Sequence, residues 1–241
     1  MATAGGPKIV TRGLKFYIDS SNTKSYQSGS SQWKDLMQKE YHMTINAGES
    51  VNTSTANAPV LFFDGAQGSY STWSGPQLTS PAIFDTSDFT YIVLAYPTSL
   101  AGVDNPGYVR TMESGGWPNS YIICQWNSGS KSINFSGEDD NQETFNFSTG
   151  NDKIDVNEWW FSAFTVDRQN SLRTTYLNGE QVHQSSLSAT IQGINPTGSL
   201  RIPSSWTEYP GGIALTLMYE VSLTADEVQQ NYNALKSRFN L

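Results

Sequence analysis

The sequence predicts an all-β protein built as a two-sheet antiparallel sandwich, followed by one C-terminal helix. Strand-favouring residues recur through all 241 positions, and Gly, Pro, Asn and Ser separate them into short runs. Several runs alternate apolar and polar residues, which is the period of a half-buried strand, and a helical period begins only after Thr224. Sandwiches of this length occur as one domain. We therefore expect a single domain over residues 1–241, with a flexible arm at 1–8 and a helix at 224–238.

Residues 89–96 form the strongest predicted strand, because nearly every one of them favours β structure. Both of its faces are apolar apart from Thr90, which predicts a central position in a sheet, and Pro97 ends it. About ten to twelve strands are expected in all. The others include 14–19, 59–63, 121–126, 132–135, 144–148, 158–166 and 212–221, and long polar loops are expected at 20–31 and 98–118.

A β-hairpin is predicted where residues 173–177 and 180–183 flank Asn178-Gly179. A two-residue Asn-Gly link between strand-like runs is typical of a type I′ turn, because both residues tolerate a positive φ.

The C-terminal helix is predicted from its capping signals. Thr224 and Glu227 have the spacing of a capping box, and Leu223 and Val228 that of a hydrophobic staple. One helical face then carries Val228, Tyr232, Leu235 and Phe239, by which the helix would dock.

The charge and cysteine content exclude several function classes. The net charge is −8 and no basic cluster is present, which argues against nucleic acid and anionic membranes as partners. The N-terminus lacks the pattern of a secretory signal, and no apolar run is long enough to span a membrane. The one cysteine, Cys124, lies in an apolar run and is expected to be a small buried side chain.

A family resemblance is carried by several segments in order: residues 13–19, 22–26 and 33–36, Phe63-Asp64-Gly65, 89–97, the strand at Trp159, Tyr176-Leu177-Asn178-Gly179 and 219–239. Together they resemble the laminin-G-like, concanavalin A-like jelly-roll superfamily, in the form found in virion proteins of tailed bacteriophages. The resemblance implies a two-sheet jelly roll with its terminal helix against one edge. The fold carries lectins, glycosidases and structural modules, so function has to be argued from sites.

The run Glu138-Asp139-Asp140-Asn141-Gln142-Glu143 resembles the catalytic strand of glucanases that share this fold, in which two glutamates flank the scissile bond. The intervening residues are apolar in those enzymes and polar here, so no buried face remains. We interpret the run as a surface loop and expect no catalytic residues and no enzyme activity.

No cofactor is expected, and calcium is the one metal that the sequence leaves open. Asp19 and Asp64 are the calcium candidates, with Asp139 and Asp140 as further oxygen donors. The alternative is that Asp19 and Asp64 accept turn or capping hydrogen bonds. Cys124 and the two histidines are too widely separated for a zinc site.

Three of the seven tryptophans lie in segments that look like polar loops: Trp73, Trp117 and Trp206. An exposed indole can stack on a sugar ring or anchor an interface, so these three are the candidate ligand-binding residues. The alternative is that they fold back on the edge of the sandwich. Core packing is expected for Trp33, Trp159 and Trp160, with an outward position as the alternative for Trp159.

The main functional hypothesis is a non-catalytic virion structural protein of a tailed phage, decorating the capsid or forming part of the tail. It would be made in the host cytoplasm, bind other virion proteins and self-associate, since virion parts are symmetric assemblies. The alternative is a lectin-like adhesion module that binds a surface polysaccharide, and a third hypothesis is a glycoside hydrolase.

Overall fold

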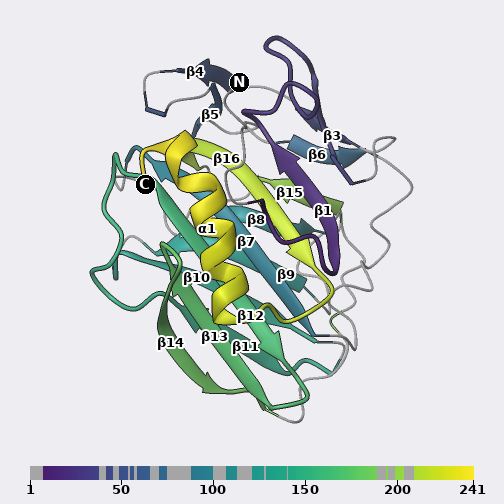
Figure 1. The fold of residues 1–241 in the computed structure, drawn as a ribbon, viewed down its shortest axis with the longest axis vertical. Coiled ribbons are helices and arrows are strands. Elements are labelled where there is room, and N and C mark those ends of the chain that lie inside the picture. The colour runs from purple at the N-terminus through teal and green to yellow at the C-terminus, as the bar shows by residue number, and fades with distance from the viewer. Residues whose placement is uncertain are drawn as a thin grey trace, which may run out of the picture.

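The computed structural model describes residues 8–37, 42–45, 49–53, 55–56, 59–65, 71–74, 88–99, 107–112, 121–127, 129–139, 141–188, 194, 199–203 and 209–241. Within these residues, two eight-stranded antiparallel sheets pack face to face, and one helix covers the outer face of one sheet (Figure 1). This is the predicted jelly-roll sandwich with a C-terminal helix. The arm predicted at 1–8 lies outside the described residues except for Lys8.

Sheet A is the sheet under the helix. Its strands lie in the order β14 (Glu180–Ser186), β13 (Leu172–Leu177), β12 (Trp160–Asp167), β7 (Phe89–Pro97), β16 (Pro210–Tyr219), β5 (Val60–Asp64) and β4 (Glu49–Asn52), and β1 (Leu14–Asp19) also pairs with β16. Sheet B follows the order β11 (Thr144–Ser148), β10 (Ser132–Glu138), β9 (Tyr121–Asn127), β8 (Gly107–Met112), β15 (Ser199–Ile202), β6 (Ser71–Ser74), β3 (His42–Ile45) and β2 (Gln32–Lys34).

The central position predicted for β7 is confirmed, because it pairs with β12 on one side and β16 on the other. Its alternation sorts its side chains into two cores. Tyr91 and Val93 lie in the core between the sheets, whereas Ile92 and Leu94 lie in a second core under the helix. A strand buried on both faces needs apolar residues at every position, which is what the sequence provides.

Helix α1 (Ala225–Phe239) begins with the predicted capping box, in which the Thr224 hydroxyl accepts from the Glu227 N–H and the Glu227 carboxylate accepts from the Thr224 N–H. Val228, Leu235 and Phe239 are buried on sheet A as expected, while Tyr232 is only half-buried. The fourth buried position is Asn231, which sequence reasoning missed. Its side chain accepts from the Val10 N–H and donates to the Tyr219 hydroxyl, so it joins the N-terminal segment to the helix.

The predicted type I′ turn is present, with φ of 51° at Asn178 and 85° at Gly179. We expect Gly179→Ala to lower the free energy of unfolding by about 1 kcal/mol, because a side chain is strained at this φ. The added methyl would also lie 2.8 Å from the Gln229 side chain, which can swing aside. Urea denaturation measures the loss.

Gly129→Ala is the matched control for the turn variant. A methyl group there would lie 3.5 Å from its nearest neighbour, the Asn127 side-chain oxygen, and the backbone is not left-handed. We expect its stability to stay within about 0.5 kcal/mol of the unsubstituted protein. Equal stability of both glycine variants would contradict the assignment of strain to the turn.

The structure corrects two loop predictions. Strand β8 lies inside the stretch 98–118, which sequence reasoning treated as one long loop, and Trp73 lies in β6 rather than in a loop. Sixteen strands occur in the described residues, more than the ten to twelve expected. The missed strands are short or polar, and their ladders with neighbouring strands hold them in place more than their own alternation does.

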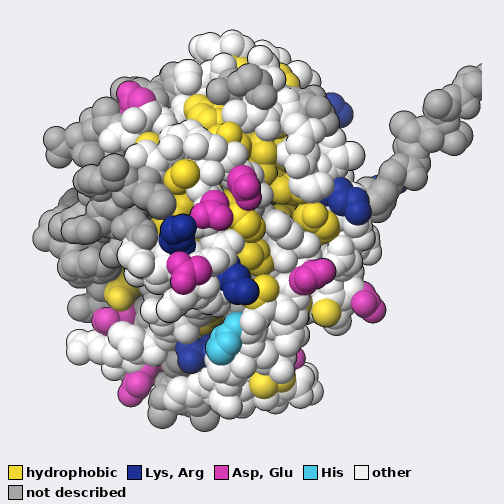
Figure 2. All heavy atoms as spheres, turned by 90° about the vertical axis from the view of Figure 1, so that its left-hand side faces the viewer, with side chains coloured by type: hydrophobic (Ala, Val, Ile, Leu, Met, Phe, Trp, Pro, Cys, Tyr) yellow, Lys and Arg dark blue, Asp and Glu magenta, His cyan; other side chains and the backbone are white. Residues whose placement is uncertain are grey.

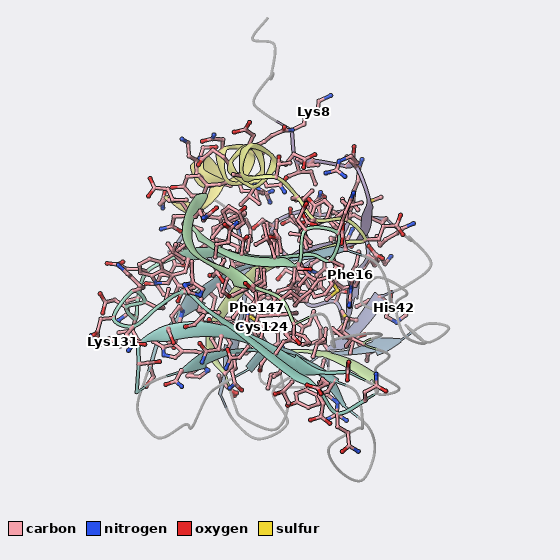
Figure 3. All side chains as sticks on the ribbon, turned by 90° about the horizontal axis from the view of Figure 1, so that it is seen from below. Lys8, Phe16, His42, Cys124, Lys131 and Phe147 are labelled. Atoms are coloured by element: carbon pink, nitrogen blue, oxygen red, sulfur yellow. The ribbon has the colours of Figure 1, made fainter. Side chains whose placement is uncertain are left out.

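Buried aromatic and sulfur-containing side chains fill the space between the sheets, where Figure 3 shows Cys124 and Phe147. Cys124 is buried as predicted, and burial raises the pKa of its thiol well above the ordinary value, so the thiol stays protonated. Trp33 is also fully buried. Trp159 is buried in the second core, under the helix, where Phe239 of α1 covers it with the ring centroids 5.5 Å apart.

Candidate functional site

The outer face of sheet B is the broad strand surface that carries neutral polar side chains. Along β9, β10 and β11, apolar side chains point into the core at every second position. The positions between them therefore face outward. On these three strands the outward positions include Gln125, Asn127, Ser132, Asn134, Ser136, Thr144, Asn146 and Ser148.

The strand register brings these groups into adjacent rows. Asn134 of β10 lies opposite Gln125 of β9 on one side and opposite Ser148 of β11 on the other. In the next row, Ser136 lies opposite Asn146. Directly opposite residues have Cβ atoms about 5 Å apart, so the amides and hydroxyls of one row can contact a single small ligand.

A hollow of about 470 Å³ forms where this face meets the edge strand β14. We call it the β10–β11 hollow. It is lined by Ser130, Ser132, Asn134, Asn146, Ser148, Gly150, Asn151, Val182 and His183, and none of these is Lys, Arg, Asp or Glu. Figure 2 faces the side of the molecule that carries β14 and shows charged side chains scattered among uncharged surface.

Hydrogen bonds within the hollow hold part of its lining in place. The Ser132 hydroxyl donates to Asn134 Oδ1 at 3.2 Å and lies 2.7 Å from the Ser130 hydroxyl. Within the described residues, no hydrogen bond engages the side chain of Asn146 or His183. The hollow therefore combines a fixed hydroxyl and amide pair with groups that remain available to a ligand.

The chemistry of the lining suits a neutral ligand that is rich in hydroxyl groups. Side-chain amides both donate and accept hydrogen bonds, and serine hydroxyls do the same. Val182, which is 37% exposed, adds an apolar surface at the rim. A few polar groups next to an apolar surface, in a cavity of this size, are typical of small-ligand sites.

The structure does not test the three tryptophans predicted to bind a ligand. Trp73 lies in β6, at a register position opposite Met43 of β3. Trp117 and Trp206 lie outside the described residues. A binding role for these tryptophans stays a prediction.

Asp19 does not fit a calcium site. Its two carboxylate oxygens accept from the two terminal nitrogens of Arg238, each at 2.9 Å, and the Tyr17 hydroxyl donates to Oδ2 at 2.9 Å. Asp19 is fully buried, so this ion pair replaces the solvent that the carboxylate has lost. Burial by itself would lower the pKa of Arg238, but hydrogen bonding to Asp19 and its negative charge outweigh burial and raise it. Burial, followed by the charge of Asp19, raises the pKa of Tyr17.

The other metal and catalytic candidates are also separated. Asp64 is an exposed residue at the end of β5, and no group of three or more His, Cys, Asp or Glu side chains in the described residues could hold a metal ion. Within the run at 138–143, the described residues Asp139 and 141–143 lie between β10 and β11. Asp139 is buried there and accepts from the N–H groups of Asn141 and Glu143, so this carboxylate stabilises the turn. Glu138 is the last residue of β10 rather than part of the loop.

The molecule is thus a β-sandwich in which a helix covers one sheet, while neutral polar groups line the β10–β11 hollow beside the other sheet. The family model described as the concanavalin A-like lectin/glucanases superfamily matches residues 65–229, and the chain belongs to this family. No curated protein matches the chain. In the described residues, no helix has the length and apolar character that crossing a membrane requires.

Solved structures with the same fold include clostridial toxin domains. The binding domain of Paraclostridial Mosquitocidal Protein 1 has a TM-score of 0.69 at 18% identity, over 92% of this chain and 52% of that one. The binding domain of botulinum neurotoxin serotype G has a TM-score of 0.68 at 13% identity, over 90% of this chain and 50% of the other. The chain spans about half the length of these domains, and the likeness at this identity concerns the fold.

Proposed function

We propose that this chain is a non-catalytic, lectin-like binding module that takes a neutral glycan in the β10–β11 hollow. The observation that carries the proposal is the hollow's lining, which offers amides, hydroxyls and an exposed valine without a charged side chain. Sugar hydroxyls match such amides as both donors and acceptors, and a sugar's C–H face matches an apolar rim.

Two further findings support a binding role over a purely structural role. The chain belongs to a superfamily whose description includes lectins, and the similar structures are binding domains of toxins. The adhesion module that the sequence suggested as an alternative is therefore better supported than a purely structural virion protein. The toxin domains have the same fold and are binding domains, which also favours a non-enzymatic role.

The test is a double variant, Asn134→Ala with Asn146→Ala, screened with the unsubstituted protein on an array of neutral glycans. We expect binding to weaken by at least about tenfold, because each change removes both donors and acceptors from the hollow. Urea denaturation should show little change in stability, since Asn146 is exposed and Asn134 half-buried at the surface.

Asn233→Ala is the matched control, since it removes an amide from α1 on the opposite side of the sandwich. It should bind glycan as well as the unsubstituted protein. Loss of binding in Trp117→Ala, with the double variant unaffected, would move the site from the hollow to that tryptophan. An array with no neutral glycan bound by the unsubstituted protein would contradict the proposed function itself.

As a finer proposal, we infer that the module acts on the virion of a tailed phage, where it would contact other virion proteins and its own copies. The support is the resemblance of its sequence segments to such virion proteins; the toxin domains do not bear on it. Mass spectrometry of purified particles tests the location. A strictly monomeric protein without affinity for virion proteins would contradict this part.

A further inference from the structure

A second hollow lies at the other end of sheet B, beside its edge strand β2. It has a volume of about 660 Å³, and we call it the β2 pocket. The loop that the sequence predicted at 20–31 forms one wall, and β2 forms the other. Its lining includes the side chains of Lys24, Gln27, Ser30, Gln32, Lys34 and Leu36.

We propose that the β2 pocket binds the anionic group of an acidic saccharide, a sugar that carries a carboxylate or a sulfate. It would be a second site, with a ligand class different from that of the β10–β11 hollow. The proposal does not rest on the function proposed above, because each hollow can bind its ligand without the other.

The first argument is the charge of the pocket. The whole chain has 14 Lys and Arg against 22 Asp and Glu, yet two lysines meet in this one hollow. Among the described residues, neither Lys24 nor Lys34 forms an ion pair, whereas Lys15 pairs with Glu220 and Lys131 with Asp155. Both amines remain available to an anion, and each can donate three hydrogen bonds.

The one carboxylate in the lining, that of Asp35, is buried and hydrogen-bonded to backbone groups. Asp35 is 1% exposed, and its Oδ1 accepts from the N–H groups of Tyr17 and Met37 at 3.0 and 2.9 Å. The bond from Tyr17 ties the residue after β2 to β1. The exposed lining therefore carries two positive charges and no exposed carboxylate among its members.

The walls of the pocket are held in place by hydrogen bonds and buried side chains, without a ligand. The Lys34 N–H donates to the Ser25 carbonyl at 2.7 Å, and the Ser25 hydroxyl accepts from the Asp19 N–H at 3.1 Å. Beneath them, Trp33 is fully buried and Tyr26 nearly so. A preformed wall avoids the entropic cost of ordering the loop on binding.

The third argument is the remaining lining, which matches the body of a sugar. Gln27 and Gln32 add amides to the lining. The side-chain nitrogen of Gln32 lies 3.4 Å from Nε2 of His42. Leu36 lines the pocket, and next to it in the chain stands Met37, a hydrophobic residue that is 44% exposed. Cations, amides and an apolar surface together favour an acidic sugar over a bare inorganic anion.

Titration calorimetry on the full chain tests the proposal with a galacturonic acid trimer, its methyl-esterified neutral counterpart and galactose 6-sulfate. We expect the acid trimer to bind at least about tenfold more tightly than the ester, with the difference shrinking as salt is added. Binding of one anion alone supports the proposal and identifies the group as carboxylate or sulfate. Measurable and equal binding of the acid and the ester, or no binding of either anion, would overturn it.

The variant for this test is Lys24→Gln with Lys34→Gln, which should weaken binding of the acid trimer by about tenfold. Lys8→Gln is the matched control, because Figure 3 shows Lys8 far from His42 at the β2 end of the molecule. A similar loss in Lys8→Gln would mean that overall charge, not the pocket, attracts the anion, and would overturn the assignment. Thermal unfolding confirms that the variants are folded, and Asn134→Ala with Asn146→Ala should leave binding of the acid trimer unchanged.

Discussion

Replacing Arg238 with Met is expected to lower the free energy of unfolding by about 3–5 kcal/mol, which is typical of removing one partner from a buried ion pair. Asp19 is fully buried and would keep only the Tyr17 hydroxyl and the Ser21 N–H as hydrogen-bond donors. The fold would then hold a charge with no counter-charge. Urea denaturation at neutral pH measures the loss in the free energy of unfolding.

Lys236→Met is the matched control, because Lys236 is an exposed cation on the same helix and forms no ion pair with a described residue. Its stability should change by no more than about 0.5 kcal/mol. Adding Asp19→Asn to the Arg238 variant should restore part of the loss, since the buried group is then neutral. A loss in Arg238→Met no larger than that in Lys236→Met would show that the ion pair does not stabilise the fold.

Phe135→Ala is expected to cost about 3–5 kcal/mol, since it empties the centre of the core between the sheets. The Phe135 side chain is fully buried and contacts other rings from both sheets. Its neighbours, with ring centroids 5.3–6.0 Å away, are Tyr91, Phe164, Phe147, Phe145 and Phe89. These rings cannot all move to fill the cavity, because strands on both sheets fix them.

Phe135→Leu is the control for the size of the cavity, and we expect a loss of roughly 1.5 kcal/mol. Chemical denaturation of both variants gives the comparison. Asn134 directly precedes Phe135 in β10 and points outward, so Asn134→Ala should leave stability almost unchanged. Equal losses for Phe135→Ala and Phe135→Leu would contradict the assignment of the loss to the size of the cavity.

The sequence predicted the parts of the fold whose signals are local. Residues 144–148 alternate cleanly, and β11 has those bounds. Asn178-Gly179 and the Thr224 capping box also act within a few residues, and both are present. Strand β6 is different, because its four residues are held by β3 and β15, which are distant in the chain. Such pairing cannot be deduced from alternation in one short segment.

The candidate sites were harder to predict than the fold. The sequence predicted tryptophans and carboxylates as the candidate groups, whereas the β10–β11 hollow is lined mainly by Ser and Asn and the β2 pocket mixes Ser and Gln with two lysines. A signal was present in Ser132, Asn134, Asn146 and Ser148, which place uncharged polar groups at the outward positions of two consecutive strands. The same pattern also occurs on any solvated sheet. The hollow forms because edge strand β14 of sheet A lies beside these strands of sheet B, and that packing depends on long-range contacts between the sheets.

Because helix α1 covers sheet A, the two sides of the sandwich differ. Near the N-terminus, Val10 is hydrogen-bonded to Asn231 of the helix, and Leu241 packs in the core beneath the helix. Figure 3 shows the helix and Lys8 on one side of the sandwich and the strands of sheet B on the other. A carrier joined after Leu241 would therefore lie on the helix side of the sandwich, opposite sheet B. Several copies on one carrier would present their faces in parallel, so weak single contacts would add up to strong attachment to a repetitive polymer.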